Sequence, residues 1–159
     1  MKTLFAAALA AAVLAASAPA LAASPHDGAW TLDPSHSFWS NTGPLPANFK
    51  LTVNMKFGPN KLEYHSVNTT NAKPYISDHV TALDGSITPF ANQERFNQVS
   101  VTQTDADNLQ ILKMKDGDVI AGEFWTFGPD GKTAIRRGVG KSPEGKSHAY
   151  QEAFVHTAQ

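Results

Sequence analysis

The sequence predicts an all-β fold, in which short antiparallel strands form an up-and-down meander that closes into a lipocalin-like barrel of about eight or nine strands. Two observations favour this fold: apolar and polar residues alternate over long stretches, and tight-turn sequences separate the alternating runs. After the first 22 residues, no segment has the 3.6-residue hydrophobic period of a helix. Each run is therefore expected to be one strand with an apolar face and a polar face.

The alternation is clearest between residues 49 and 57, where every second residue is apolar. Period two places all of these apolar side chains on one face of a strand. Further runs rich in Val, Thr, Tyr, Phe and Ile lie at 62–70, 75–83, 97–104, 108–115, 118–127, 132–141 and 147–156.

The turn sequences between the runs predict the strand register. With GPNK as a loop, Met55 faces Tyr64 across the first hairpin. A next turn centred on Ala72 would place Ser66 opposite Asp78. These pairs keep mostly apolar residues on the interior face.

The later hairpin around GPDG predicts which arginine faces the interior. With a four-residue loop, Glu123 faces Arg136 and Gly122 faces Arg137. We expect Arg137 and Phe124 on the inner face, since Arg137 shares a face with Ile135 and Val139, and the Glu123–Arg136 pair on the outer face. A buried cation is costly unless an anion pairs with it, so an inward Arg137 needs an anionic partner.

The N-terminus predicts export. Lys2 precedes the apolar run LFAAALAAAVLAA, and Ala20-Leu21-Ala22 is a small-x-small cleavage site. Residues 1–22 are expected to be a cleaved secretory signal, and residues 23–159 one barrel domain in the periplasm or the medium. The run is short for a membrane span, and the sequence has no cysteine that could carry a lipid anchor.

Composition limits the classes of partner and chemistry. The chain has 13 Lys and Arg residues against 14 Asp and Glu residues, so it lacks the positive field expected of a nucleic-acid-binding protein. Catalytic motifs with a Cys nucleophile, Gly-x-Ser-x-Gly, His-Glu-x-x-His or a phosphate-binding loop are also missing. His65 and His79 are expected to face each other on a solvated surface, so neither a metal site nor a cofactor is predicted.

Five segments, taken in chain order, resemble a known group of proteins: GAWTLDPSHS, GPLP, LDGSITPF, FNQVSVTQTDADNLQILKMKDGDVIAG and GPDGKT. The group consists of small exported bacterial proteins with a lipocalin-like, calycin-type β-barrel. Gly28 and Trp30 match the Gly-x-Trp motif of the first strand. The resemblance implies a barrel with an internal cavity and no particular activity, since most members have no assigned function.

Together these features predict non-enzymatic binding of a small apolar or amphipathic ligand, with ligands that bear a carboxylate included. Arg137 would hold such a carboxylate through two parallel hydrogen bonds. Alternatively, Arg137 pairs with Asp78 or stacks on Trp30. The candidate ligand-binding residues are Arg137, Tyr150, Tyr64, Asp78, Met55 and Phe124.

Two local alternatives stay open. One register of the last strand turns His148, Tyr150, Glu152 and Phe154 inward, and the other turns Ala149, Gln151, Ala153 and Val155 inward. The segment SFWSNTGPLP at 37–46 is either a lid over the barrel or a surface loop packed by Phe38.

Two other functions also remain open. A barrel filled by its own side chains would be a structural or interaction scaffold. A barrel enzyme of the isomerase or hydrolase type would use Tyr64, Asp78 and Arg137. The presence of a cavity separates a ligand-binding protein from a scaffold, whereas the ligand and the oligomeric state are not predicted.

Overall fold

The computed structural model describes residues 23–91, 94–142 and 145–157. The predicted signal peptide, residues 1–22, lies outside the described residues. In the described ranges no helix is long and apolar enough to cross a membrane. The strands found there are β1 Gly28–Trp39, β2 Gly43–Pro44, β3 Leu51–Gly58, β4 Lys61–Asn68, β5 Tyr75–Ala82, β6 Asp84–Pro89, β7 Gln98–Gln103, β8 Asn108–Lys115, β9 Asp118–Phe127, β10 Thr133–Lys141 and β11 Ser147–Thr157.

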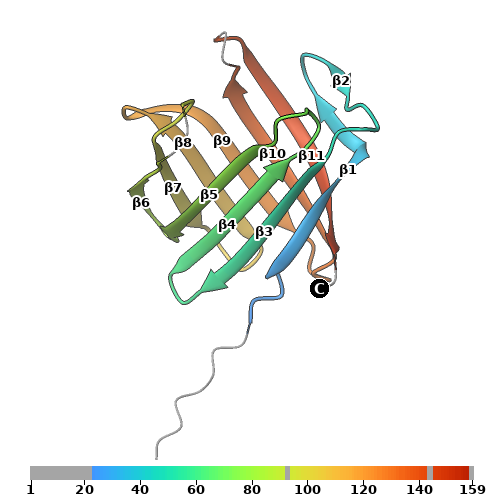
Figure 1. Cartoon of the computed structure of the whole chain (residues 1–159). Helices are drawn as coiled ribbons and strands as arrows, with labels where there is room; N and C mark the ends of the chain where they lie inside the picture. The colour runs from blue at the N-terminus through green and yellow to red at the C-terminus, as the bar shows by residue number, and fades with distance from the viewer. Residues whose placement is uncertain (1–22, 92–93, 143–144, 158–159) are drawn as a thin grey trace, which may run out of the picture.

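These strands form one antiparallel sheet that curls into a nearly closed barrel (Figure 1). The strand order is β5-β4-β3-β1-β11-β10-β9-β8-β7-β6, and the short β2 pairs with β1. Closure comes from β1, which pairs with β3 on one side and with the last strand, β11, on the other. Among the described strands, the order ends at β5 and β6, where the barrel stays open.

The predicted fold class is confirmed, although the described residues hold more strands than the eight or nine expected. Strands β3 to β5 and β7 to β11 match the predicted runs to within two residues at each end. The two unpredicted strands are β2 and β6. Strand β6 has the burial pattern of a mostly exposed edge strand and carries no clear apolar alternation, so period-two reasoning misses it.

The register of the first hairpins is partly as predicted. Met55 does pair with Tyr64. Ser66, however, pairs with Ser77 instead of Asp78, so the β4–β5 register differs from the expected one by a single residue. Because neighbouring residues of a strand point to opposite faces, this slip turns Asp78 to the outer face.

The β9–β10 hairpin corrects the predicted inner face. Phe127 pairs with Ala134, so the connection is two residues longer than the four-residue loop expected. A change of two residues leaves each side chain on the same face as before, but the inside and outside were assigned the wrong way round. Arg136 is 7 % exposed, whereas Phe124 is 45 % exposed.

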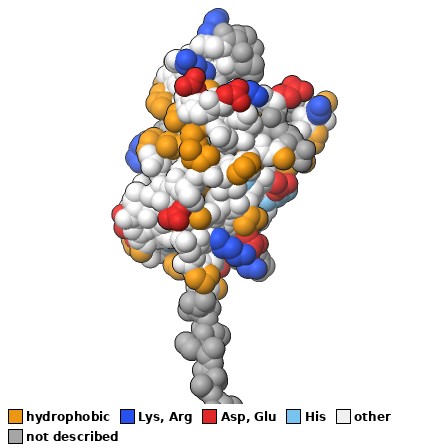
Figure 2. Space-filling view, turned by 90° about the vertical axis from the view of Figure 1, so that its left-hand side faces the viewer, with side chains coloured by type: hydrophobic (Ala, Val, Ile, Leu, Met, Phe, Trp, Pro, Cys, Tyr) orange, Lys and Arg blue, Asp and Glu red, His pale blue; other side chains and the backbone are white. Residues whose placement is uncertain are grey.

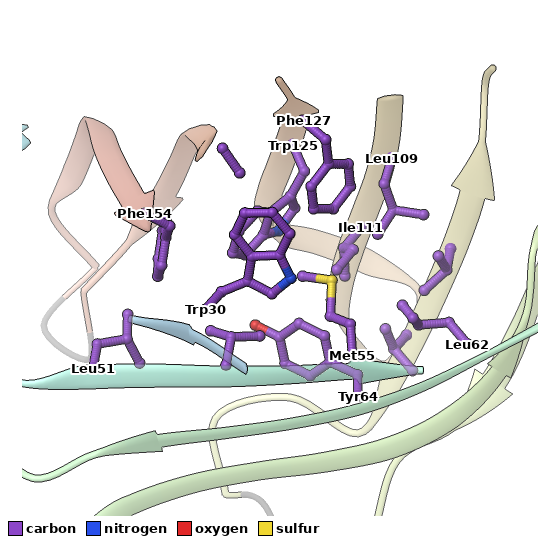
Figure 3. Packing of buried hydrophobic residues seen from close by; sticks show 14 of the residues in the cluster. Trp30, Leu51, Met55, Leu62, Tyr64, Leu109, Ile111, Trp125, Phe127 and Phe154 are labelled. Carbon is purple, nitrogen blue, oxygen red and sulfur yellow. The ribbon is translucent and has the colours of Figure 1, made fainter. Parts of the chain in front are cut away.

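An apolar core packs inside the barrel around Trp30, which is completely buried (Figure 3). Figure 3 shows the Trp30 indole between Met55 and Tyr64 on one side and Trp125 and Phe127 on the other. The remaining core residues are Leu32, Leu45, Leu51, Val53, Leu62, Leu83, Phe90, Phe96, Val99, Val101, Leu109, Ile111, Ala134 and Phe154. Burial of this much apolar surface is the main source of folding free energy.

Gly28 sits where β1 closes against the last strand. Its φ is +121°, and a Cβ atom there would lie 2.7 Å from Nε2 of His156. The His156 ring stacks on Trp30 with the two ring centroids 4.4 Å apart. The same ring contacts the backbone carbonyl oxygens of Asp27 at 2.9 Å and Gly131 at 2.8 Å. The Gly-x-Trp motif thus makes room for a histidine that joins β1, β11 and the β9–β10 connection.

Replacing Gly28 with alanine should lower the free energy of unfolding by about 2–4 kcal/mol, from backbone strain at positive φ plus the collision with His156. Gly43→Ala is the control, because Gly43 also has a positive φ but no atom within 4 Å of its would-be Cβ. The free energy of unfolding of Gly43→Ala should fall by only about 1 kcal/mol. Urea unfolding followed by tryptophan fluorescence measures both, and equal losses would contradict the role assigned to the His156 contact.

Candidate functional site

A cavity of about 750 Å³ opens at the end of the barrel where β1 ends and β3 begins. Its walls include the aromatic side chains of Trp39, Phe49, Phe96 and Tyr150, together with Leu51. Residues of the β4–β5 and β6–β7 connections form the rim. The cavity therefore occupies the part of the barrel that the Trp30 core leaves unfilled.

Four buried charged side chains lie at the inner end of this cavity, and we call them the floor network: Lys113, Glu123, Arg136 and Glu152. They come from four neighbouring strands, β8 to β11. No side chain among them is more than 10 % exposed. Lys113 donates from Nζ to Glu123 Oε1, and Arg136 donates from Nη1 to Glu123 Oε2 at 3.3 Å. Arg136 also donates from Nε to Glu152 Oε2 at 2.7 Å, and from Nη2 to the same oxygen.

Surrounding charges hold two members of the floor network, Glu123 and Arg136, in their ionised forms. Burial alone would raise the pKa of Glu123, but the charges of Lys113 and Arg136 outweigh burial and lower this pKa to about 2. Burial would likewise lower the pKa of Arg136, but Glu152 and Glu123 raise it well above its usual value. The floor network thus pairs two basic side chains with two acidic ones.

Aromatic rings replace part of the water that these cations lose. The Arg136 guanidinium lies 5.2 Å from the ring centroid of Trp125, 5.3 Å from that of Phe154 and 5.6 Å from that of Tyr150. The Lys113 ammonium lies 5.3 Å from the ring centroid of Phe96. Such contacts stabilise a desolvated cation through the negative face of the ring.

Trp39 and Tyr150 connect the floor network to the cavity wall. Trp39 donates from Nε1 to Glu152 Oε1 at 3.0 Å, and its ring packs 5.9 Å from that of Tyr150. The Tyr150 ring lies over Gly138, where a Cβ atom would come within 2.2 Å of the tyrosine Cζ. Burial raises the pKa of Tyr150, so its hydroxyl remains protonated. A bulkier residue in place of Gly138 would displace this wall.

The structure decides the register of the last strand and rules out one of the two alternatives for segment 37–46. His148, Tyr150, Glu152 and Phe154 point inward in the last strand. In segment 37–46, Phe38 is exposed, so the alternative in which Phe38 packs this segment is wrong. Its neighbour Trp39 lines the cavity instead.

Three of the candidate ligand-binding residues point away from the interior, so their predicted inward orientation is wrong. Arg137 is exposed and donates from Nε to Gln151 Oε1 at 3.1 Å. Asp78 is exposed and accepts a hydrogen bond from His65, and Phe124 lies opposite Arg137 on the outer face. Neither proposed alternative for Arg137, pairing with Asp78 or stacking on Trp30, occurs.

The other three candidates do point into the barrel. Tyr150 lines the cavity. Met55 and Tyr64 belong to the apolar core, where the Tyr64 hydroxyl lies 3.5 Å from Arg136 Nη1. Sequence reasoning missed the floor network itself. Its signal was a charged residue at an apolar position of the alternation, as with Glu152 between Tyr150 and Phe154.

A second polar feature runs along the inner face of β5. Ser77, His79 and Thr81 are buried, and their side-chain polar atoms have no hydrogen-bond partner among the described residues. The His79 ring stacks on Tyr64 with centroids 4.7 Å apart. Burial, and then the charge of Lys113, lower the pKa of His79 to about 4, so its ring is neutral at pH 7.

The expected pairing of two histidines on the outer surface is wrong. Tyr64 is the residue opposite His79, and Asp78 is the residue opposite His65. The one-residue register change in β5 puts the two rings on opposite faces of the sheet. Within the described part of the chain, no three His, Asp or Glu side chains come together as metal ligands would.

The molecular surface has no dominant charge on the face drawn in Figure 2. Lysine and arginine side chains (blue) and acidic side chains (red) both occur there, with hydrophobic side chains (orange) between them. This mixture follows from the nearly balanced counts of basic and acidic residues in the sequence.

Two solved structures share the barrel architecture. Apo lipid binding protein 8 of Caenorhabditis elegans aligns with a TM-score of 0.54 at 12% identity, over 84% of this chain and 96% of that chain. A protein of unknown function from Nostoc punctiforme, of the DUF3598 family, aligns with a TM-score of 0.51 at 11% identity. It is matched over 84% of this chain, which spans 48% of that protein's length. At such identities the likeness shows the fold alone.

No protein-family model matches the sequence, and no curated protein matches it.

Adjacent arginines on β10 give a matched test of the corrected inner face. Arg136→Met should lower the free energy of unfolding by about 3–5 kcal/mol, because it leaves two buried carboxylates without their shared cation. Arg137→Met should change it by no more than about 0.5 kcal/mol, because that side chain is solvated. Chemical denaturation of both variants measures the difference, and similar losses would contradict the buried network.

His79 should make stability depend on pH between about 6.5 and 4. The unfolded chain protonates His79 near 6.5, but the folded protein does so only near 4. Stability from this group is thus fully present above pH 6.5 and is lost as the pH falls. From pH 6.5 to 5, wild type should lose about 1.5 kcal/mol more than His79→Phe. Between pH 7.5 and 9 the free energy of unfolding of the two proteins should change with pH in the same way. If the substitution also leaves the pH dependence unchanged between pH 6.5 and 5, His79 is not the group responsible.

Proposed function

We propose that this chain binds a small amphipathic molecule in the barrel cavity, without catalysing a reaction, after export and removal of residues 1–22. The observation that carries the proposal is a cavity of about 750 Å³ with aromatic walls and a polar floor. Small-molecule sites commonly occupy concave, mostly apolar pockets of roughly 300–1,000 Å³ with a few polar groups that orient the ligand.

The distribution of packing favours ligand binding over a filled scaffold. Trp30 and its neighbours fill the other part of the barrel, whereas Trp39, Phe49 and Tyr150 line space on the cavity side. A scaffold would gain stability from apolar side chains in that space, since unfilled volume in a core is destabilising. An aromatic-lined cavity that the side chains of the barrel do not fill is therefore better explained by ligand binding.

The charge states favour binding over catalysis. A pKa of about 2 makes Glu123 a poor proton acceptor at neutral pH, where a general base works best with a pKa near the ambient pH. The residues expected for a barrel enzyme are also separated, since Asp78 and Arg137 lie on the outer face and Tyr64 lies in the core.

The structural comparison adds support at the level of the fold. The aligned Caenorhabditis elegans protein is described as a lipid binding protein, and it covers most of the same barrel. This likeness supports a ligand inside the barrel of the present chain, with contacts of its own.

N-phenyl-1-naphthylamine, an uncharged probe that fluoresces in apolar surroundings, tests the proposal directly. Its emission should rise with saturation on titration into the mature protein. Ala121→Phe, on the inner face of β9, should weaken the affinity by about tenfold or more by filling the cavity. The control is Ala149→Phe on the exposed face of β11, which should bind as wild type does. Lack of saturable binding to wild type, or unchanged binding to Ala121→Phe, would refute a ligand site in this cavity.

A further inference from the structure

Every carboxylate oxygen of the floor network already accepts a hydrogen bond. Glu152 uses Oε1 for the Trp39 indole and Oε2 for the Arg136 fork. Glu123 uses Oε1 for Lys113 and Oε2 for Arg136. The two cations and the two anions thus neutralise each other within the protein, before any ligand is bound.

A charged ligand group would meet a like charge at this floor. A carboxylate that approached Arg136 would also approach Glu123 and Glu152, because both hold that guanidinium. An ammonium group would meet Lys113 and Arg136. Placing a further buried charge beside this already paired set is unfavourable whichever its sign.

Uncharged acceptors have donors available there. Lys113 donates one of its three ammonium hydrogens within the floor network, to Glu123. Tyr150, which carries a hydroxyl donor, also lines the cavity. His148 adds a buried ring nitrogen, Nδ1, with no hydrogen-bond partner among the described residues. These groups suit the oxygen atom of an alcohol or a carbonyl compound.

Charges at the rim do not alter this preference. Lys73 and Glu94 line the opening, where they are exposed to water, and Arg95 beside them is half-buried. Arg95 also donates to the backbone carbonyl of Lys141. Exposed charges are screened by water and salt, unlike those at the buried floor.

We propose that the ligand presents an uncharged oxygen, as a hydroxyl or carbonyl group, to Lys113 and Tyr150, and that the site discriminates against both carboxylates and amines. This inference rests on the proposed function, since it specifies the ligand class of the same cavity. The apolar body of the ligand would lie against Trp39, Phe49 and Leu51.

Displacement of N-phenyl-1-naphthylamine by four eight-carbon compounds tests the inference: octan-1-ol, octan-2-one, octanoate and octylamine at pH 7. The alcohol and the ketone should displace the probe at concentrations about tenfold or more below those needed for octanoate or octylamine. If octanoate or octylamine displaces the probe as well as the alcohol does, the inference is wrong and the ligand site stands. If the probe itself does not bind, the proposed function fails with it.

Two variants that change the charge of the floor should shift this preference in opposite directions. Glu123→Gln leaves a net positive floor. It should raise the affinity for octanoate, relative to that for octan-1-ol, by about tenfold. Lys113→Met leaves a net negative floor and should instead raise the affinity for octylamine relative to that for octan-1-ol. The controls, Asp78→Asn and Arg137→Gln, make the same changes in total charge on the outer face and should keep the wild-type preference.

Folding of each variant is checked by circular dichroism and thermal unfolding before titration. If one variant does not fold, the other variant and the wild-type series still decide the inference. If Glu123→Gln or Lys113→Met folds and still binds the four compounds in the wild-type order of affinity, the inferred preference for uncharged oxygen groups is wrong.

Discussion

The pairing of Arg136 with Glu123 and Glu152 is the constraint on which the cavity depends. A buried guanidinium is tolerated only where anions and hydrogen-bond acceptors surround it. Here β9 and β11, the two neighbours of β10, each supply one carboxylate. The pairing therefore requires the register of three adjacent strands to be correct at once. It also places polar groups where an apolar core would otherwise continue.

The floor network separates two environments inside one barrel. On one side lies the apolar core around Trp30, where His156 and Gly28 close β1 against β11. On the other side lies the aromatic-walled cavity, with Trp39 hydrogen-bonded to Glu152. Trp39 belongs to the strand that closes the barrel. Closure and formation of the cavity wall thus depend on the same segment.

The sequence predicted the fold well because the apolar alternation and the turn sequences are local signals. Met55 and Tyr64 were paired correctly, since a short turn fixes their register. The inner face of β10 was assigned wrongly. Ile135 and Val139 make the opposite face of β10 the more apolar one in the sequence, whereas Arg136 is stabilised inside by Glu152 and by Trp125, which come from other strands. Long-range compensation of this kind is not encoded in any single stretch of sequence.

The same long-range compensation bears on both stability and selectivity. A polar network in a low-dielectric interior is stabilising only when each member is satisfied, so Glu123 and Glu152 cannot give up their cation without loss. A ligand that offered its own charge would have to compete for Arg136 or Lys113 against these carboxylates. A ligand that offers a neutral oxygen can use the remaining donors and leave the pairs intact. The interactions that make a buried arginine compatible with folding thereby also determine which head groups the cavity can accept.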